Sequence, residues 1–177
     1  MNQKCLFLDR DGVINIDYGY VYKIKDFHFI EGIFDIANKA IGQGYIIIVI
    51  TNQSGIGRGL FSAEQFKTIT EWMVEQFRKQ DILITDVYYS PFHPTHGVGK
   101  YKKVDNTRKP SPGMIIKAAK DFNIDLKKSI FVGDKLSDME AGFSAGVRTN
   151  ILFDSKRESS QNNYYQISTL NQIELYL

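Results

Sequence analysis

The chain has 177 residues, of which 43% are hydrophobic and 24% charged, with a formal net charge of +2. This composition is that of a globular protein with its own core, and it excludes a disordered chain or a strongly basic nucleic-acid-binding protein. The single cysteine, Cys5, cannot form an internal disulfide, which fits a reducing compartment. The longest apolar run, residues 45–50, is too short to cross a membrane, and the first residues lack a signal-peptide pattern. We expect one cytoplasmic domain over residues 1–177.

Five segments have the composition of strands that are largely buried. They cover residues 4–9, 45–50, 86–90, 129–134 and 149–153. Between them, apolar residues recur at the spacing of helices, which are predicted over 32–44, from Ser62 to about Lys79, 112–122 and 136–145. A polar patch at 154–163 precedes a short strand and a final helix. The alternation predicts an α/β fold, a doubly wound and mostly parallel sheet with helices on both faces and no large cap domain.

Charged and polar side chains stand where these strands end. Ligands of parallel sheets bind beyond the carboxyl ends of the strands, so the groups at those ends are expected to meet at one edge. The groups are Asp9 and Asp11 after the first strand, Thr51 to Ser54 after the second, Arg108 and Lys109 in the long polar loop 91–111, and Asp134, Lys135 and Asp138 after the fourth.

Acids that share one point repel one another unless a cation neutralises them, and oxygen ligands with open positions suit Mg²⁺. A carboxylate can also attack phosphorus and form an aspartyl phosphate. Asp9 ends its strand and is the expected nucleophile, while Asp11 is placed to protonate the leaving oxygen and then to activate water. Thr51 and Lys109 can bind the oxygens of the transferring phosphoryl group.

Four motifs in chain order carry a resemblance to a known superfamily. They are Asp9-x-Asp11-Gly12, Thr51 after a strand, Lys109 before Pro110, and "GDKLSD" at 133–138. This set resembles the haloacid dehalogenase superfamily of phosphatases. The stretches "FLDRDGVIN", "TNQSGIGRG", "RKPSPGM" and "VGDKLSDMEAG" are similar to the D-glycero-D-manno-heptose 1,7-bisphosphate phosphatases. The phosphatase half of bifunctional histidine-biosynthesis enzymes is a near relative.

The resemblance implies a set of site residues. Asp9 and Asp134 would bind Mg²⁺ through their side chains and Asp11 through its backbone carbonyl. Substrate contacts would come from three regions of the chain. These are Asp17, Tyr18, Gly19 and Tyr20; Asn52, Gln53 and Ser54; and Arg108 with Lys135.

One departure from the family pattern concerns zinc. Relatives usually carry a zinc-binding loop with Cys-x-His before it and Cys-x-Cys just ahead of Arg-Lys-Pro. The corresponding positions here hold Ser90, Phe92, Asp105 and Thr107, which are poor zinc ligands as a set. His93 and His96 without thiolates do not make a closed tetrahedral site. Zinc is therefore not expected, and the loop would either be held by packing, such as that of Phe92 with Tyr101, or be mobile.

Each residue also has a simpler interpretation. Asp9 and Asp11 could be a solvated loop pair, Thr51 and Ser54 could only terminate a strand, and Lys109 could lie on the surface. Asp138 could be an outer acid of the site or the cap of the helix near 136. Lys100, Lys102 and Lys103 fit a solvated face or a position near the substrate. Cys5 is expected in the core, and "GIGRG" does not match the dinucleotide-binding glycine pattern.

The expected activity is Mg²⁺-dependent removal of the 7-phosphate of D-glycero-D-manno-heptose 1,7-bisphosphate, for nucleotide-heptose synthesis and hence lipopolysaccharide or capsule. Histidinol-phosphate hydrolysis is the alternative enzyme activity. A phosphosugar-binding module is the non-enzyme alternative, and it would be expected to lack a catalytic acid, whereas both Asp9 and Asp11 are present. The expected partner is a small phosphosugar, with no nucleic acid and no membrane, and the expected state is a monomer.

Overall fold

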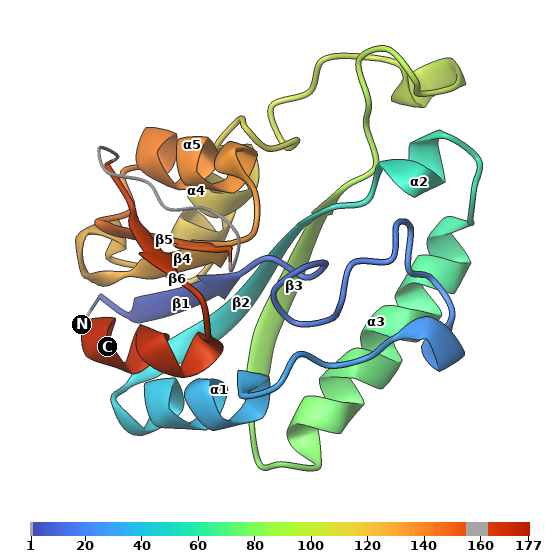
Figure 1. The fold of residues 1–177 in the computed structure, drawn as a ribbon. Helices are drawn as coiled ribbons and strands as arrows, with labels where there is room; N and C mark the ends of the chain where they lie inside the picture. Colours follow the sequence, from blue (N-terminus) through green and yellow to red (C-terminus); the bar gives the residue numbers. More distant parts are fainter. Residues whose placement is uncertain (1, 155–162) are drawn as a thin grey trace.

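The computed structural model describes residues 2–154 and 163–177 (Figure 1). Six strands form one sheet in the order β3-β2-β1-β4-β5-β6, and all five neighbouring pairs are parallel. The strands are β1 (Lys4–Leu8), β2 (Tyr45–Asn52), β3 (Ile84–Ser90), β4 (Ile130–Gly133), β5 (Thr149–Phe153) and β6 (Tyr165–Ile167). The direction of winding reverses between β1 and β4, which is where parallel sheets open a crevice for ligands.

Helices cover both faces of the sheet, as the sequence predicted. In Figure 1, α4 and α5 lie above the sheet, and α1 and the C-terminal 3₁₀ turns lie below it. The longer elements are α1 (Ile33–Gly42), α3 (Ala63–Arg78), α4 (Gly113–Asp121), α5 (Leu136–Ala145) and η4 (Leu170–Tyr176). The short ones are η1 (Ile24–Asp26), α2 (Ser54–Gly57), η2 (Gly99–Tyr101) and η3 (Leu126–Lys128).

Side chains on the two faces of β1 pack into two separate hydrophobic cores. Leu6 and Leu8 belong to the larger core under α1 and α3, whereas Cys5 and Phe7 belong to the smaller core under α4 and α5. This alternation follows from the two-residue repeat of a strand, and it explains why β1 is apolar on both sides. Cys5 is fully buried, so its predicted place in the core is confirmed.

The structure differs from the sequence prediction at some boundaries. β3 begins at Ile84, two residues before the predicted start, and the final helix is a 3₁₀ segment. The short helix α2 was not predicted because its residues, Ser54 to Gly57, have the composition of a loop. The predicted capping box at Ser62 and Gln65 is present. Most of the polar patch, residues 155–162, lies outside the described residues.

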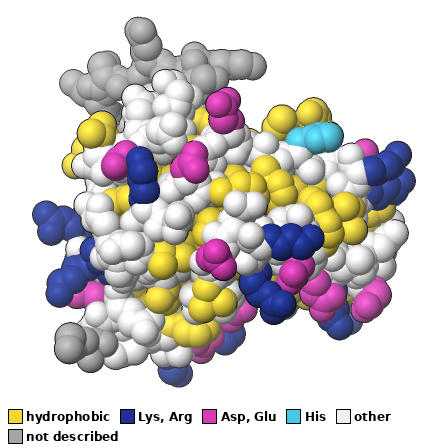
Figure 2. All heavy atoms as spheres, turned by 90° about the horizontal axis from the view of Figure 1, so that it is seen from below, with side chains coloured by type: hydrophobic (Ala, Val, Ile, Leu, Met, Phe, Trp, Pro, Cys, Tyr) yellow, Lys and Arg dark blue, Asp and Glu magenta, His cyan; other side chains and the backbone are white. Residues whose placement is uncertain are grey.

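Among the described helices, none has the length and apolar character that a membrane crossing requires. Figure 2 shows the molecule from below, where Lys and Arg side chains are interspersed with Asp and Glu and with hydrophobic atoms. On this face the basic residues do not gather into one continuous surface.

Candidate active site

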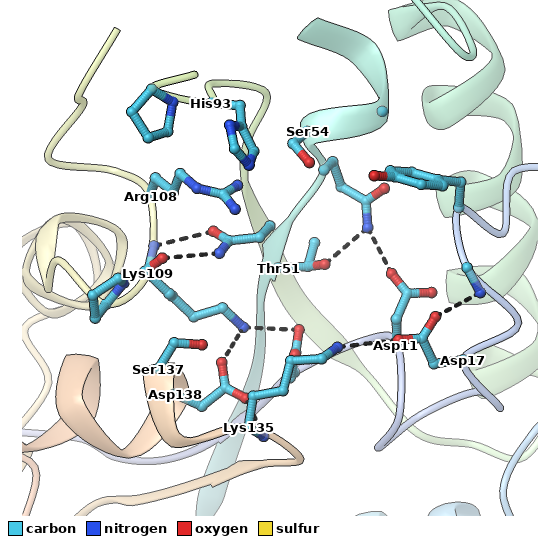
Figure 3. A pocket seen from close by; sticks show the side chains of 18 residues that line it. Asp11, Asp17, Thr51, Ser54, His93, Arg108, Lys109, Lys135, Ser137 and Asp138 are labelled. Carbon is cyan, nitrogen blue, oxygen red and sulfur yellow. Dashed lines mark hydrogen bonds and ion pairs between the residues drawn. The ribbon is translucent and has the colours of Figure 1, made fainter. Parts of the chain in front are cut away.

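A cavity of about 560 Å³ lies at the carboxyl ends of the central strands (Figure 3). It is bordered by the ends of β1 and β2, by the loop after β3, and by the start of α5. Most of the predicted site residues lie along it. The lining includes Asp9, Asp11, Asp17, Gly19, Tyr20, Thr51, Asn52, Gln53, Ser54, His93, Arg108, Lys109, Lys135 and Asp138.

Asp9 directly follows the last residue of β1, and it is only 5% exposed. One carboxylate oxygen accepts a hydrogen bond from the backbone N–H of Arg10 at 2.7 Å. Burial raises the pKa of Asp9 to about 7; the Lys109 ammonium opposes that rise, and the charges of Asp138 and Asp134 add to it. Asp9 is therefore a poorly solvated carboxyl group beside one cation.

That cation, Lys109, is buried among oxygen atoms. Its Nζ lies 2.9 Å from Asp9 Oδ1 and 2.8 Å from Asp138 Oδ1, and it donates to the Ile50 carbonyl at 2.9 Å. Burial alone would lower the pKa of Lys109, but the two carboxylates outweigh it and raise the pKa. The simple interpretation of Lys109 as a surface residue is wrong, since its side chain is 2% exposed.

Asn52 fixes the backbone from which Lys109 extends. Its side-chain oxygen accepts from the Lys109 N–H at 3.0 Å, and its side-chain nitrogen donates to the Lys109 carbonyl at 3.1 Å. Both functional ends of the Asn52 amide are thus engaged by one backbone position. In this structure Asn52 joins the end of β2 to the loop after β3, in addition to lining the cavity.

Asp9, Asp134 and Asp138 form a group of three acids whose nearest oxygens all lie within 4.8 Å of one another. Burial raises the pKa of Asp134 to about 6, although the nearby Lys135 opposes that rise. Asp134 Oδ1 is buried and makes no hydrogen bond to the described residues. Gly12 lets the first acidic loop approach this group, because a Cβ there would overlap the Asp134 carboxylate.

Asp138 has both of the roles that the sequence left open. One of its oxygens pairs with Lys109, while the other accepts the backbone N–H of Lys135 at 3.0 Å and so caps the start of α5. It is 1% exposed, so this acid is part of the buried site as well as a helix cap.

On the opposite side of the cavity, a chain of hydrogen bonds links Thr51 to Asp11. The Gln53 side-chain nitrogen donates to Thr51 Oγ1 and to Asp11 Oδ2, each at 2.9 Å. Thr51 is 1% exposed and lies one residue before the end of β2 at Asn52. Gln53 therefore connects two elements of the site.

The segment 17–20 is only partly at the cavity. Asp17 accepts the Gly19 N–H at 2.9 Å and pairs with Lys135 at 3.0 Å, and Lys135 also lies 3.3 Å from Asp134. Burial opposes the positive charge of Lys135, yet Asp134 and Asp17 raise its pKa. Tyr18 is 62% exposed and packs edge-on against His28, away from the lining.

The positions that correspond to family zinc ligands lie close together. Thr107 Oγ1 contacts Ser90 Oγ at 3.1 Å and Asp105 Oδ1 at 2.6 Å. Lys103 pairs with Asp105 at 2.8 Å and lies over the ring of Phe92 at 4.2 Å. The predicted packing of Phe92 with Tyr101 is confirmed, with ring centroids 5.9 Å apart. These contacts join the two ends of the loop.

Several residues near the cavity were not singled out from the sequence as site residues. His93 and Ser137 line it, and Arg58 hydrogen-bonds to the Tyr20 hydroxyl. Beside them, Arg108, which the sequence did predict as a site residue, donates to the Phe92 carbonyl at 3.1 Å. Burial, followed by the positive charges of Arg108, His96 and Arg58, lowers the pKa of His93. The only signal for Arg58 was its place in the "TNQSGIGRG" loop.

The family of this chain is shown by comparison with known proteins. A family model described as polynucleotide kinase 3 phosphatase matches residues 8–164. A protein of Burkholderia mallei, named D-glycero-alpha-D-manno-heptose-1,7-bisphosphate 7-phosphatase, is 51% identical over 152 residues, which are 86% of this chain and 80% of that protein.

Solved structures have the same fold. A candidate had-like phosphatase from Mesorhizobium loti is 34% identical with a TM-score of 0.85, over 92% of this chain and 78% of that one. The D,D-heptose 1,7-bisphosphate phosphatase of B. bronchiseptica, solved with magnesium and phosphate, is 24% identical with a TM-score of 0.84, over 98% and 97%. The chain belongs to the polynucleotide kinase 3 phosphatase family and is a phosphatase of the haloacid dehalogenase superfamily.

Proposed function

We propose that the chain removes the 7-phosphate of D-glycero-D-manno-heptose 1,7-bisphosphate in a Mg²⁺-dependent reaction. The observation that carries the proposal is the group of Asp9, Asp134 and Asp138 with Lys109 at the carboxyl ends of the central strands, in a chain 51% identical to a relative with that name. Three acids with one ammonium leave negative charge that a divalent cation and a phosphate would balance together.

The described residues fit a divalent cation. Asp134 Oδ1 is buried with no hydrogen-bond partner in the described part of the chain, and Asp9 offers a second oxygen within 4.8 Å. Oxygen atoms are the ligands that Mg²⁺ prefers. The proposed ligands are the side chains of Asp9 and Asp134 and the backbone carbonyl of Asp11, while Asp138 is held by Lys109. When bound, Mg²⁺ would neutralise the acids and withdraw charge from the phosphate oxygens.

In the proposed reaction, an oxygen of Asp9 forms a bond to phosphorus as the bond from phosphorus to the sugar oxygen breaks. Asp11 gives its proton to the departing sugar oxygen. A water molecule then attacks the aspartyl phosphate, its proton returns to Asp11, and the bond between Asp9 and phosphorus breaks. Thr51 and Lys109 are proposed to bind the equatorial oxygens of the transferring group, since both lie beside Asp9 in the cavity.

The second phosphate of the substrate needs a cation at a distance from Asp9. Lys135 is a weaker candidate than its position in the sequence indicated, because Asp17 and Asp134 already pair with it. Arg108 lines the same cavity beside His93, and a carbonyl rather than a carboxylate holds it. We therefore assign the main contact with the distal phosphate to Arg108, with Lys135 as a secondary one.

The remaining sequence-based assignments fit around this core. Gly19, Tyr20 and Ser54 line the cavity and are proposed to contact the sugar, with Asp17, Asn52 and Gln53 holding the cavity wall. Tyr18 would contact substrate only if it left His28. We propose that residues 1–177 act as one monomeric, cytoplasmic domain without zinc, supplying heptose for lipopolysaccharide or capsule.

The test is to measure phosphate release from the heptose 1,7-bisphosphate, from histidinol phosphate and from p-nitrophenyl phosphate, at the same enzyme concentration and with Mg²⁺ present. We expect the heptose 1,7-bisphosphate to have the highest kcat/KM, with ³¹P spectra showing that the 7-phosphate is lost. A preference for histidinol phosphate would overturn the substrate and leave the phosphatase chemistry intact. No release from either compound or from p-nitrophenyl phosphate would support the phosphosugar-binding alternative instead.

A further inference from the structure

Arg10, between the two acids of the first motif, is among the largest fully buried side chains in the protein. It is 1% exposed, although a guanidinium loses much hydration when it is buried. Its Nη1 makes no hydrogen bond to the described residues. A buried cation with an incompletely satisfied donor costs stability, so its position calls for a function.

Most of the other hydrogen bonds from the Arg10 guanidinium go to one neighbour, the proposed proton donor Asp11. Nη2 lies 2.7 Å from Asp11 Oδ1 and 2.8 Å from Oδ2, and Nε lies 3.2 Å from Oδ1. Asn15 donates to Oδ1 at 3.0 Å and Gln53 to Oδ2 at 2.9 Å. The Asp11 carboxylate is therefore gripped by three side chains, of which only Arg10 binds both oxygens.

The Arg10 guanidinium also contacts two aromatic rings and one backbone carbonyl. Its guanidinium carbon lies 5.9 Å from the ring centre of Phe27 and 5.7 Å from that of Phe66 on α3. Nη2 also donates to the Val21 carbonyl at 2.7 Å. Val21 directly follows the segment 17–20 that borders the cavity. The guanidinium thus links Asp11 to the core and to one wall of the cavity.

We propose that Arg10 is a positioning residue that fixes the Asp11 carboxyl group, which in its protonated form gives a proton to the leaving oxygen and in its ionised form takes one from water. Asp11 faces the cavity from the side opposite Lys109 (Figure 3). Without the guanidinium, Asn15 would hold Oδ1 and Gln53 would hold Oδ2, each by a single hydrogen bond from a neutral amide. The carboxyl group would lose the charged partner that binds both oxygens, and would therefore be held less firmly. The inference deepens the proposed function, since it rests on Asp11 acting as the proton donor.

A positioning role predicts dependence on the leaving group. p-Nitrophenolate leaves without protonation, whereas phenolate from phenyl phosphate needs more help from a proton donor. Arg10→Met keeps a long side chain without the fork. We expect it to lower kcat/KM for phenyl phosphate by roughly 10- to 100-fold, which is part of the roughly 10²- to 10⁴-fold that a general acid contributes, and for p-nitrophenyl phosphate by less than about threefold. Arg10→Lys, with one point donor, should fall between Arg10→Met and the unmodified protein.

Asp11→Asn separates failure of the inference from failure of the proposed function. It should show the same dependence on the leaving group, and equal losses on both aryl phosphates would reject Asp11 as proton donor. If Asp11→Asn shows the dependence and Arg10→Met does not, the positioning role is wrong. In the Asp11→Asn background, adding Arg10→Met should change kcat/KM for phenyl phosphate by less than about threefold, because coupled residues are not additive.

A folding defect needs its own control. Met73 is fully buried in the same core and has no part in the site, so Met73→Ala supplies a destabilised protein with an intact pair. It should lower the unfolding temperature and scale both aryl phosphates equally. Should Arg10→Met fail to fold, Arg10→Lys carries the test, and equal losses on both substrates there would overturn the proposal.

Discussion

The Lys109 ammonium and the Asp138 carboxylate form an ion pair with Nζ and Oδ1 2.8 Å apart, and neither side chain is more than 2% exposed. Removing one partner of a buried pair leaves an uncompensated charge, which costs far more than losing a surface pair. Asp138 thus holds the cation that faces Asp9.

Asp138→Ala should lower the free energy of unfolding, because it removes one of the two carboxylate partners of Lys109 and the cap of α5. Since Asp9 still pairs with Lys109, the loss should stay below the roughly 3–5 kcal/mol expected when a buried charge loses its only partner. Asp138→Asn keeps an acceptor for the capping N–H, so it should cost less stability while still lowering kcat. Urea unfolding and phosphate release measure the two effects. As a control, Asp121→Asn breaks an exposed pair with Lys117 and should leave activity unchanged. Equal stability of Asp138→Ala and the unmodified protein would contradict this role.

The nucleophile assignment makes a sharper prediction. Asp9→Asn should reduce kcat by roughly 10⁴-fold or more, since an amide cannot form the phosphoenzyme. The fold should survive, because the shape is unchanged and Lys109 keeps its pair with Asp138. Thermal unfolding checks the fold and phosphate release checks the activity. Turnover within tenfold of the unmodified protein would reject Asp9 as nucleophile.

Metal binding should depend on pH. In the metal-free protein the pKa is about 7 for Asp9 and about 6 for Asp134, so both carboxyls are largely protonated at pH 5. A cation must displace those protons, and Mg²⁺ affinity should therefore rise as the pH increases from 5 to 8. Titration calorimetry in two buffers should detect protons released at pH 5.5 and few at pH 8, and Asp9→Asn should release fewer. Constant affinity across this range would contradict the ligand assignment.

The same pKa values set the stability of the metal-free protein. A folded-state pKa above that of the unfolded chain means that the folded protein binds more protons between about pH 4 and 7. The free energy of unfolding of the metal-free protein should therefore decrease as the pH rises through that window, and saturating Mg²⁺ should raise it again.

Turnover should depend on the same metal. Chelation should stop turnover, and added Mg²⁺ should recover it.

The strand ends of the site could be predicted from the sequence because they follow from topology. Parallel strands deliver their carboxyl ends to one edge, so Asp9 and Thr51 were bound to meet once β1 and β2 were recognised. Side-chain partners could not be predicted in this way. Lys135 pairs with Asp17, 118 residues away, and that contact depends on how a surface segment folds over the sheet.

The orientation of single side chains could not be predicted from the sequence either. Tyr18 and Tyr20 are two residues apart, yet only Tyr20 lines the cavity, because its backbone has a positive φ of 54° and its hydroxyl meets Arg58. No periodic pattern in the sequence predicts a residue with positive φ at this position. The same holds for Asp138, whose two roles became clear only from its two oxygens.

The loop after β3 should need no zinc. Thr107 contacts both Ser90 and Asp105 directly, and Lys103 adds an ion pair with Asp105. Elemental analysis of the purified protein should find no stoichiometric zinc, and 1,10-phenanthroline should leave the unfolding temperature unchanged. Asp105→Ala should make the loop more susceptible to proteolysis, since it removes contacts to both Thr107 and Lys103. One tightly held zinc per chain would show that the loop is organised differently.

Arg108 should determine the preference for a bisphosphate. It is half-buried in the cavity wall, and Thr51 and Lys109 are the proposed contacts of the reacting phosphate. A charge-assisted contact to a phosphate contributes roughly 1.5–3 kcal/mol, so Arg108→Ala should lower kcat/KM for the heptose 1,7-bisphosphate by about 10- to 150-fold. The matched heptose 7-phosphate lacks the distal group and should be hydrolysed almost as before. Lys135→Ala is the comparison variant: its pairs with Asp17 and Asp134 support the site itself, so both substrates should suffer. An equal loss on both substrates for Arg108→Ala would place Arg108 on the transferring phosphate.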